Sequence, residues 1–170
     1  MVNLTGIDVI FYELDQVNSK FETRITMIAA KLKFRGIDAW GNGAFNASRI
    51  GSNGKVKKHH GIDYACEPGL EILSPCIGKV TKLGYPYSYV NQGTNFRYVE
   101  IIDLNKLKHR VFYIEPSVRI GDQVTILTVI GKVQNIADKY STEHKIMVNH
   151  IHYEVIDKGQ YLDPASMGHE

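Results

Sequence analysis

Short runs of alternating apolar and polar residues dominate the chain after residue 70. Between residues 147 and 156, apolar residues alternate with His150, His152 and Glu154. A period of two is typical of a strand with one face in the core, and it places both histidines on the same polar face. Other short apolar segments, separated by turn residues, occupy residues 71–73, 78–83, 97–103, 110–114, 123–127 and 129–133. This spacing predicts a mainly β domain, an antiparallel sandwich or barrel.

The N-terminal part of the chain has a different pattern. From Leu14 to Leu32, apolar residues recur at steps of three and four, without Pro or Gly. This period is typical of one face of an amphipathic helix, and Gly36 would end it. Such a helix could pack on its own domain, or it could dock a protein partner or a second copy of the chain. A strand over residues 21–28 is the alternative.

A Gly-rich stretch follows this segment. Residues 39–54 are rich in Gly, Asn and Ser and are predicted to form a loop. We therefore expect an N-terminal segment over residues 1–38 and a β domain over residues 39–170. The N-terminal segment is expected to be dispensable for folding of the β domain but necessary for docking.

Composition and charge limit the kinds of protein to which this chain can belong. Of the 170 residues, 44% are hydrophobic and 22% are charged, with a net charge of +2. A nucleic-acid-binding protein would carry a stronger basic excess. Arg49 and three lysines at 55–58 form a local basic cluster. This cluster could be part of a solvated loop, or it could attract an anionic polymer such as cell wall. No apolar run approaches the ~18 residues of a membrane span, and no secretory leader is visible. Cys66 and Cys76 could pair or remain buried thiols.

Two short stretches carry the candidate chemistry. Lys58–Asp63 contains His59 and Asp63 four residues apart, in a Gly-containing segment where a helix is not expected. On an extended chain, positions four apart share a face, so the two side chains can converge on one ion. Zinc is bound by imidazole nitrogen and carboxylate oxygen at ~2.0–2.2 Å, and a catalytic site keeps one position open for water. The pattern predicts His59, Asp63 and His152 as ligands, with His150 beside the open position.

In these residues the chain resembles the lysostaphin-type zinc endopeptidases, which cut peptidoglycan cross-bridges. The motifs are His59-x-Gly61-x-Asp63, and His150-x-His152 followed by an aromatic residue, Glu and Val. The resemblance extends over residues 41–164, with shorter matches at 43–49, 78–80, 121–124, 130–133 and 162–164. It implies a lysostaphin-type antiparallel β sandwich or split barrel, here preceded by the N-terminal helical segment. By the family pattern, His59, Asp63 and His152 hold zinc and His150 is catalytic.

One position departs from that pattern. The family usually has Tyr-x-His where this chain has Tyr113-Ile114-Glu115, so Glu115 stands in place of a second catalytic imidazole. A carboxylate could assist catalysis, but it donates a proton at neutral pH only if burial raises its pKa. Placing His at position 115 is therefore expected to raise turnover. The segment Phe112–Pro116 also resembles the leukocyte chemotaxin relatives of this fold, which keep a zinc site but are regarded as signalling proteins.

We therefore expect a zinc metalloendopeptidase that cleaves peptide cross-links of bacterial peptidoglycan, with His150 and Glu115 as its catalytic residues and weak turnover. The alternative is a zinc-holding, peptidase-like binding or structural module that is catalytically weak or inactive. A phosphocarrier of the same fold is disfavoured, because phosphocarriers use paired histidines without a ligand like Asp63. His60 and His144 are the histidines that could replace the missing imidazole.

The expected substrate lies outside the cytoplasmic membrane. A wall enzyme without a leader needs another delivery route. A phage particle or a lysis system would supply one, and earlier processing of a longer chain would be another. The loop 84–95 contains three tyrosines, among them Tyr87. These could wall a groove for a peptide with small side chains, or form an ordinary surface loop.

Overall fold

The computed structural model describes residues 32–50, 54–87 and 96–167. The chain divides into two compact units, Met1–Leu32 and Lys33–Glu170. Apart from Leu32, the predicted N-terminal helix lies outside the described residues. The second unit begins before residue 39, because Lys33–Phe34 is already a strand (β1) of its largest sheet. No helix among the described residues is long and apolar enough to cross a membrane.

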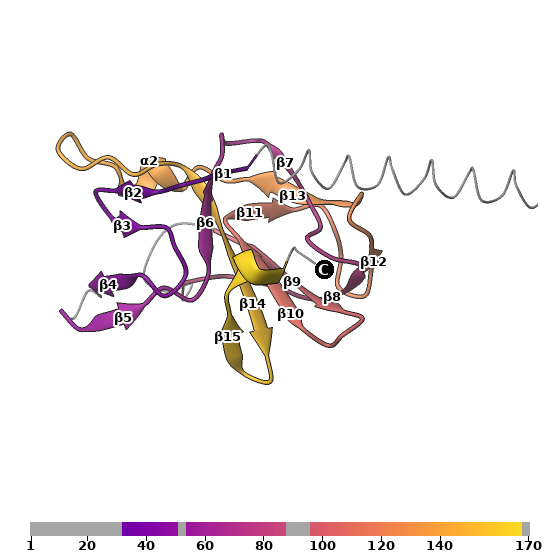
Figure 1. Ribbon diagram of the computed structural model, residues 1–170. Coiled ribbons are helices and arrows are strands. Elements are labelled where there is room, and N and C mark those ends of the chain that lie inside the picture. The colour runs from indigo at the N-terminus through magenta and orange to yellow at the C-terminus, as the bar shows by residue number, and fades with distance from the viewer. Residues whose placement is uncertain (1–31, 51–53, 88–95, 168–170) are drawn as a thin grey trace, which may run out of the picture. The chain divides into compact units, whose positions relative to one another are not determined.

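Antiparallel strands make up most of the second unit, which confirms the predicted mainly β fold (Figure 1). The eight-stranded sheet has the order β1-β6-β14-β10-β9-β8-β12, with β15 paired to β14. After β1, these strands are Ile62–Ala65, His150–Asp157, Lys108–Phe112, Tyr98–Asp103, Gly78–Gly84 and Gln123–Val124, and β15 is Gln160–Leu162. A three-stranded sheet has the order β11-β13-β7, which are Ile114–Pro116, Val129–Val133 and Glu71–Leu73.

Two hairpins and two short helices complete the described part of this unit. The hairpins are β2–β3, Ile37–Asp38 with Gly41–Asn42, and β4–β5, Ser48–Ile50 with Val56–Lys58. The helices are α2, Ile136–Tyr140, and the 3-10 helix η1, Pro164–Met167. The β4–β5 hairpin lies at the side of the large sheet that carries β6 (Figure 1).

The large sheet has one apolar face and one polar face. Val99 and Ile101 on β9 are fully buried, as expected where alternate residues of a strand enter a core. Ile114 and Ile130 of the three-stranded sheet are also fully buried, so both sheets contribute to the core. Glu100, between the two apolar residues of β9, belongs to the opposite face. The polar face is therefore free to carry a site.

A row of paired charges crosses the polar face. Arg110 on β10 is the register partner of Glu100 on β9 and of Glu154 on β14. Its guanidinium Nε lies 2.8 Å from a Glu100 oxygen, and its Nη1 lies 3.7 Å from a Glu154 oxygen. A one-residue slip of either pairing would turn these charges into the core, so the row specifies the register of three strands.

The predicted loop 39–54 and the predicted strand 110–114 both differ from the structure. The predicted loop 39–54 contains β3 and β4. β3 pairs with β2, and β4 pairs with β5, with Arg49 opposite Lys57. The single strand predicted over 110–114 is interrupted at Tyr113, whose φ is 63°. This break separates β10 of the large sheet from β11 of the small sheet.

Candidate metal centre

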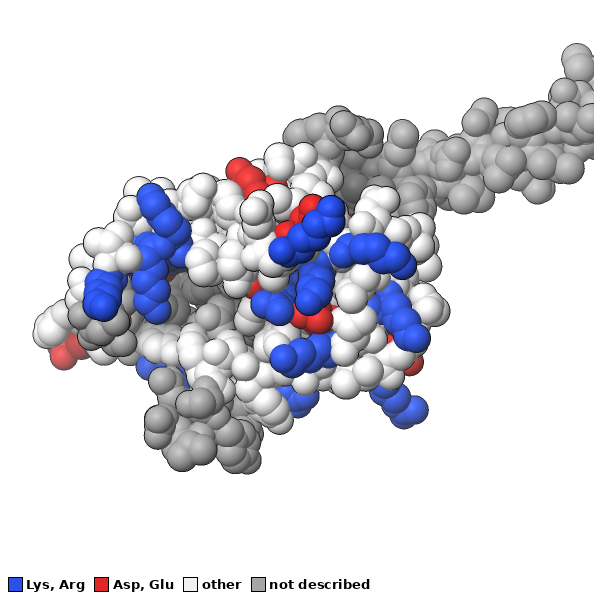
Figure 2. Space-filling view, turned by 90° about the horizontal axis from the view of Figure 1, so that it is seen from below, with Lys and Arg blue, Asp and Glu red and all other residues white. Residues whose placement is uncertain are grey.

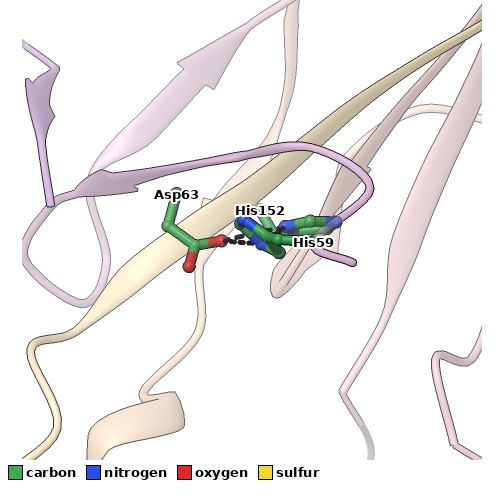
Figure 3. A group of neighbouring side chains, drawn as sticks. All are labelled: His59, Asp63 and His152. Carbon is green, nitrogen blue, oxygen red and sulfur yellow. Dashed lines mark hydrogen bonds and ion pairs between the residues drawn. The ribbon is translucent and has the colours of Figure 1, made fainter. Parts of the chain in front are cut away.

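The three predicted ligands converge in one place (Figure 3). His152 on β14 is the direct register partner of Asp63 on β6, and His59 lies just before that strand. His152 Nδ1 lies 2.9 Å from Asp63 Oδ1 and 3.0 Å from His59 Nε2. The third edge, from His59 Nε2 to Asp63 Oδ1, is 3.1 Å. Strand pairing thus brings together the two sequence stretches that carry the motifs.

The donor triangle fits a zinc ion. Three ligand atoms at ~2.0–2.1 Å from a tetrahedral zinc lie about 3.3 Å from one another. The observed edges of 2.9, 3.1 and 3.0 Å come within a few tenths of an ångström of that spacing. Two imidazoles and one carboxylate are also the donor types zinc takes in catalytic sites with an open fourth position.

Hydrogen bonds orient both imidazole ligands. His59 Nδ1 lies 2.8 Å from the Ala44 carbonyl oxygen, so this nitrogen donates its proton there and Nε2 keeps a lone pair for a metal. His152 Nε2 lies 3.2 Å from Glu154 Oε1, which leaves Nδ1 facing Asp63. Carboxylate or carbonyl partners of this kind fix ring orientation and increase ligand basicity. Glu154 of the charged row therefore also supports the metal site.

Asp63 divides its two oxygens between the imidazoles and two arginines. Oδ1 faces the histidines, whereas Oδ2 lies 2.9 Å from Arg35 Nη2 and 2.8 Å from Arg49 Nη2. Burial opposes ionisation of Asp63, but hydrogen bonds with His152 and His59 hold its pKa well below the usual range. Asp63 is therefore ionised and presents one oxygen to the two imidazoles, where a metal could bind. The sequence pattern contained no signal for the role of Arg35.

Gly61 allows the two strands to approach. A Cβ at this position would lie 2.1 Å from the Tyr153 carbonyl oxygen and 2.9 Å from the His152 ring. Only a residue without a side chain leaves room for the β14 backbone at this point. The Gly of the His-x-Gly-x-Asp motif therefore has a direct steric role beside the ligands.

His150 occupies the predicted place next to the ligands. It is buried, its Nδ1 donates to the Val148 carbonyl oxygen at 2.7 Å, and its Nε2 lies 3.9 Å from Asp63 Oδ2. Burial is the main cause that lowers the pKa of His150, although the Asp63 charge opposes this effect. A neutral ring with Nδ1 protonated leaves Nε2 as a proton acceptor.

Glu115 is not brought to this site. Its side chain is 61% exposed, and its carboxylate lies 4.0 Å from Arg97 Nη1. The positive φ of Tyr113 redirects the chain, so Glu115 pairs with Lys132 in the three-stranded sheet. Neither Glu115 nor the exposed His144 lines the cavity that surrounds the three donors.

A cavity of about 560 Å³ surrounds the donor triangle. Aromatic side chains form one part of its wall, and these are Trp40, Tyr87, Tyr113 and Tyr140. Cationic side chains form another part, and these are Arg49, Lys57 and Lys58 of the β4–β5 hairpin. Figure 2 shows Lys and Arg side chains distributed across this face of the molecule, including the side that carries this hairpin. His60 also lines the cavity, with its ring stacked on Tyr161 at 4.0 Å.

Comparisons with solved structures agree with this architecture. The chain is similar to LytU, with a TM-score of 0.54, 22% identity, and 71% of this chain and 78% of that chain covered. It is similar to the catalytic domain of the antimicrobial peptidase lysostaphin from Staphylococcus simulans, with a TM-score of 0.54, 21% identity, and 72% and 86% covered. A zinc-containing peptidase from Vibrio cholerae has a TM-score of 0.53, 21% identity, and 76% and 39% covered.

The antiparallel fold and the His–Asp–His donor set define a lysostaphin-like metallopeptidase architecture. The model of peptidase family M23 matches residues 57–164, which include all three donors and His150. The chain belongs to peptidase family M23. No curated protein matches it.

Proposed function

We propose that this protein is a zinc-dependent endopeptidase that cleaves peptide cross-links of bacterial peptidoglycan. The observation that carries the proposal is the convergence of His59, Asp63 and His152 with an adjacent buried imidazole, His150, in one cavity. Membership of peptidase family M23 and the likeness to a peptidase described as antimicrobial support the substrate class.

The three donors would hold zinc, which when bound supplies Lewis-acid chemistry and an activated water for attack on a peptide carbonyl. The hydrogen bonds of His59 with Ala44 and of His152 with Glu154 orient the two rings, so that Nε2 of His59 and Nδ1 of His152 would face the metal when it is bound. His150 accepts a proton at Nε2 from the attacking water and returns it to the leaving amine. The hydrogen bond from Nδ1 to Val148 keeps the ring in the tautomer that this role requires.

A second candidate function is a zinc-holding module with little or no turnover. The position of Glu115 favours it, because the carboxylate that replaces the second imidazole of the family pattern points away from the cavity. His60 is the remaining non-ligand imidazole among the described cavity residues, and it stacks against Tyr161. Such a module would bind zinc and wall peptides without releasing amines.

One experiment separates the two functions. Purified peptidoglycan of several wall types is incubated with the protein, with chelated protein, and with chelated protein given zinc again. An endopeptidase releases free amines, loses this activity on chelation and regains it with zinc. His150→Ala should lower the rate by ~10²–10⁴-fold, the usual contribution of a general base.

Glu115→Gln is the matched control, because it changes a polar residue outside the cavity. It should release amines at the rate of the natural protein. Zinc at one ion per chain with wall binding, but with no amine release, would establish the second function instead. Equal release by His150→Ala and the natural protein would remove His150 from the mechanism.

A further inference from the structure

Tyr113 combines an unusual backbone conformation with a place in the cavity. Its φ of 63° lies in the left-handed region, which a bulky aromatic residue rarely adopts. Such a conformation costs on the order of 1–2 kcal/mol and persists only where the surroundings enforce it. Here the Tyr113 amide donates to the Arg97 carbonyl at 2.8 Å, and the Gln134 amide donates to the Tyr113 carbonyl at 2.8 Å. The strained residue is therefore held on both sides.

The left-handed backbone of Tyr113 determines where its own side chain and the next two side chains lie. Tyr113 lines the cavity, whereas Ile114 enters the core and Glu115 faces solvent. The Tyr113 ring meets the His150 ring edge-on, with centroids 5.7 Å apart and planes at 87°. The chain thus places a phenol, rather than a carboxylate, beside the catalytic imidazole.

Tyr87 comes from a different part of the chain and meets the first phenol. The two hydroxyl oxygens lie 3.0 Å apart, so one hydroxyl donates to the other. Tyr87 also hydrogen-bonds with Tyr140. In a chain in which Tyr140 donates to Tyr87 and Tyr87 donates to Tyr113, the hydroxyl proton of Tyr113 is left for a ligand. Burial raises the pKa of Tyr113 to about 12, and burial likewise raises the pKa of Tyr87. Both phenols are therefore protonated, and able to donate, across the physiological range.

We propose that Tyr113 is a catalytic residue whose hydroxyl donates a hydrogen bond to the carbonyl oxygen of the scissile peptide, and that Tyr87 is a positioning residue that orients it. The proposal rests on the proposed function. A donor aimed at an oxygen that gains negative charge is worth most inside a cavity, where water does not compete. The phenol would thus stabilise the developing charge while His150 handles the proton.

The test compares Tyr113→Phe and Tyr87→Phe with the natural protein, all loaded with zinc. Tyr64→Phe is the control, because Tyr64 is half-buried beside Asp63 in sequence but does not line the cavity. Tyr113→Phe should lower kcat on soluble peptidoglycan peptides by ~10²–10³-fold, as removal of an oxyanion donor does. KM and zinc content should stay unchanged. Tyr87→Phe should lower kcat less, because Tyr113 keeps its hydroxyl. Unchanged kcat in Tyr113→Phe would overturn the proposal.

A second measurement does not depend on turnover. Binding of a phosphinic Gly–Gly pseudopeptide, which mimics the tetrahedral centre, is compared with binding of the matching amide by calorimetry. Tyr113→Phe should bind the phosphinate at least tenfold more weakly and the amide equally well, with Tyr64→Phe unchanged. If the natural protein releases no peptide, the proposed function fails, and this comparison alone decides the role of Tyr113. Equal phosphinate affinity in the natural protein and Tyr113→Phe, or no affinity in either, would overturn the inference.

Discussion

Asp63 shows how one side chain serves two purposes at the residue scale. One oxygen faces the metal position, and the other anchors Arg35 and Arg49. Because the guanidiniums occupy Oδ2, the carboxylate would coordinate a metal through Oδ1 alone. The Arg35 side chain is only 1% exposed, so its charge depends on nearby carboxylates for stabilisation.

We expect Asp63→Ala to lose most of its zinc. We also expect the free energy of unfolding of the zinc-free protein to fall by about 3 kcal/mol, because a buried guanidinium loses a partner. Elemental analysis and urea unfolding measure the two effects. Glu67→Ala, which removes an exposed carboxylate, should change stability by less than about 0.5 kcal/mol. A full zinc complement in Asp63→Ala would contradict the ligand assignment.

His152 gives the zinc-free protein a pH-dependent stability. Burial opposes its protonation, but hydrogen bonds with Asp63 and Glu154 raise the pKa of His152 to about 9. An unfolded His has a pKa of ~6.5. Because the folded state holds the proton more tightly, this stabilisation is fully present below about pH 6.5 and is lost as the pH rises toward 9.

We therefore expect the free energy of unfolding of the zinc-free protein to fall by on the order of 3 kcal/mol between these pH values. Urea unfolding across the interval measures it. His152→Gln should flatten the curve, because it removes the titrating group. Parallel curves for the two proteins would show that another group titrates.

The sequence pattern predicted that some residues of the cavity would lie together and missed others, for a physical reason. His59, Asp63, His150 and His152 are chemically distinctive, and their spacing on extended chain places them on shared faces. The place of Tyr113 in the cavity depends on its left-handed backbone, which no local pattern encodes. This same conformation is why the expectation for Glu115 does not match its position in the structure.

At the element scale, the break between β10 and β11 decides which residue enters the cavity. Glu115 pairs with Lys132 of β13, away from the donors. We therefore expect Glu115→His to leave the rate of amine release within about twofold of the natural rate, because the new imidazole would stay outside the cavity. Side-by-side peptidoglycan digestion measures it. A faster variant would mean that this segment rearranges to bring position 115 to the site.

The contact between β6 and β14 depends on Gly61. A Cβ here would lie 2.1 Å from the Tyr153 carbonyl oxygen, so Gly61→Ala must push the two strands apart. We expect a loss of roughly 1–3 kcal/mol in the free energy of unfolding, as for other overpacked sites, together with weaker zinc binding. Denaturant unfolding and zinc titration measure these effects.

Gly69→Ala is the matched control for that change. Gly69 has a φ of 84° with no atom within 4 Å of an added Cβ, so only backbone strain applies. It should lose about 1 kcal/mol and bind zinc normally. Normal zinc affinity in Gly61→Ala would show that the donors tolerate a separation of the strands.

At the scale of the whole molecule, the alternation of apolar residues was sufficient to predict an antiparallel β fold. The boundary was harder to predict, because β1 and β2 are only two residues each and leave no periodic pattern. The order of strands in the sheet could not be predicted either, because β6 and β14 pair although they lie far apart in the sequence. Arg35 follows β1, and its amide donates to the Asp63 carbonyl oxygen at 2.9 Å.

We expect a chain that begins at Lys33 to fold and bind zinc as the full chain does, because it retains the whole second unit. A chain that begins at Ala39 loses β1 and Arg35, and should be less stable and bind zinc more weakly. Circular dichroism, urea unfolding and zinc titration of the two truncations measure this. Equal behaviour would show that β1 and Arg35 contribute nothing to the site.

The register of β6 against β14 has a consequence for how the chain reaches its native state. His152 and Asp63 are 89 positions apart and meet only when the two strands pair in one alignment. Closing so large a loop is entropically slow, and contacts of this range reduce folding rates. An ion that binds only the aligned pair lowers the free energy of that alignment relative to every shifted one. Zinc binding would thus favour the native pairing of β6 with β14 over shifted pairings. Refolding in the presence of zinc should therefore give a higher yield of active protein than refolding first and adding zinc later.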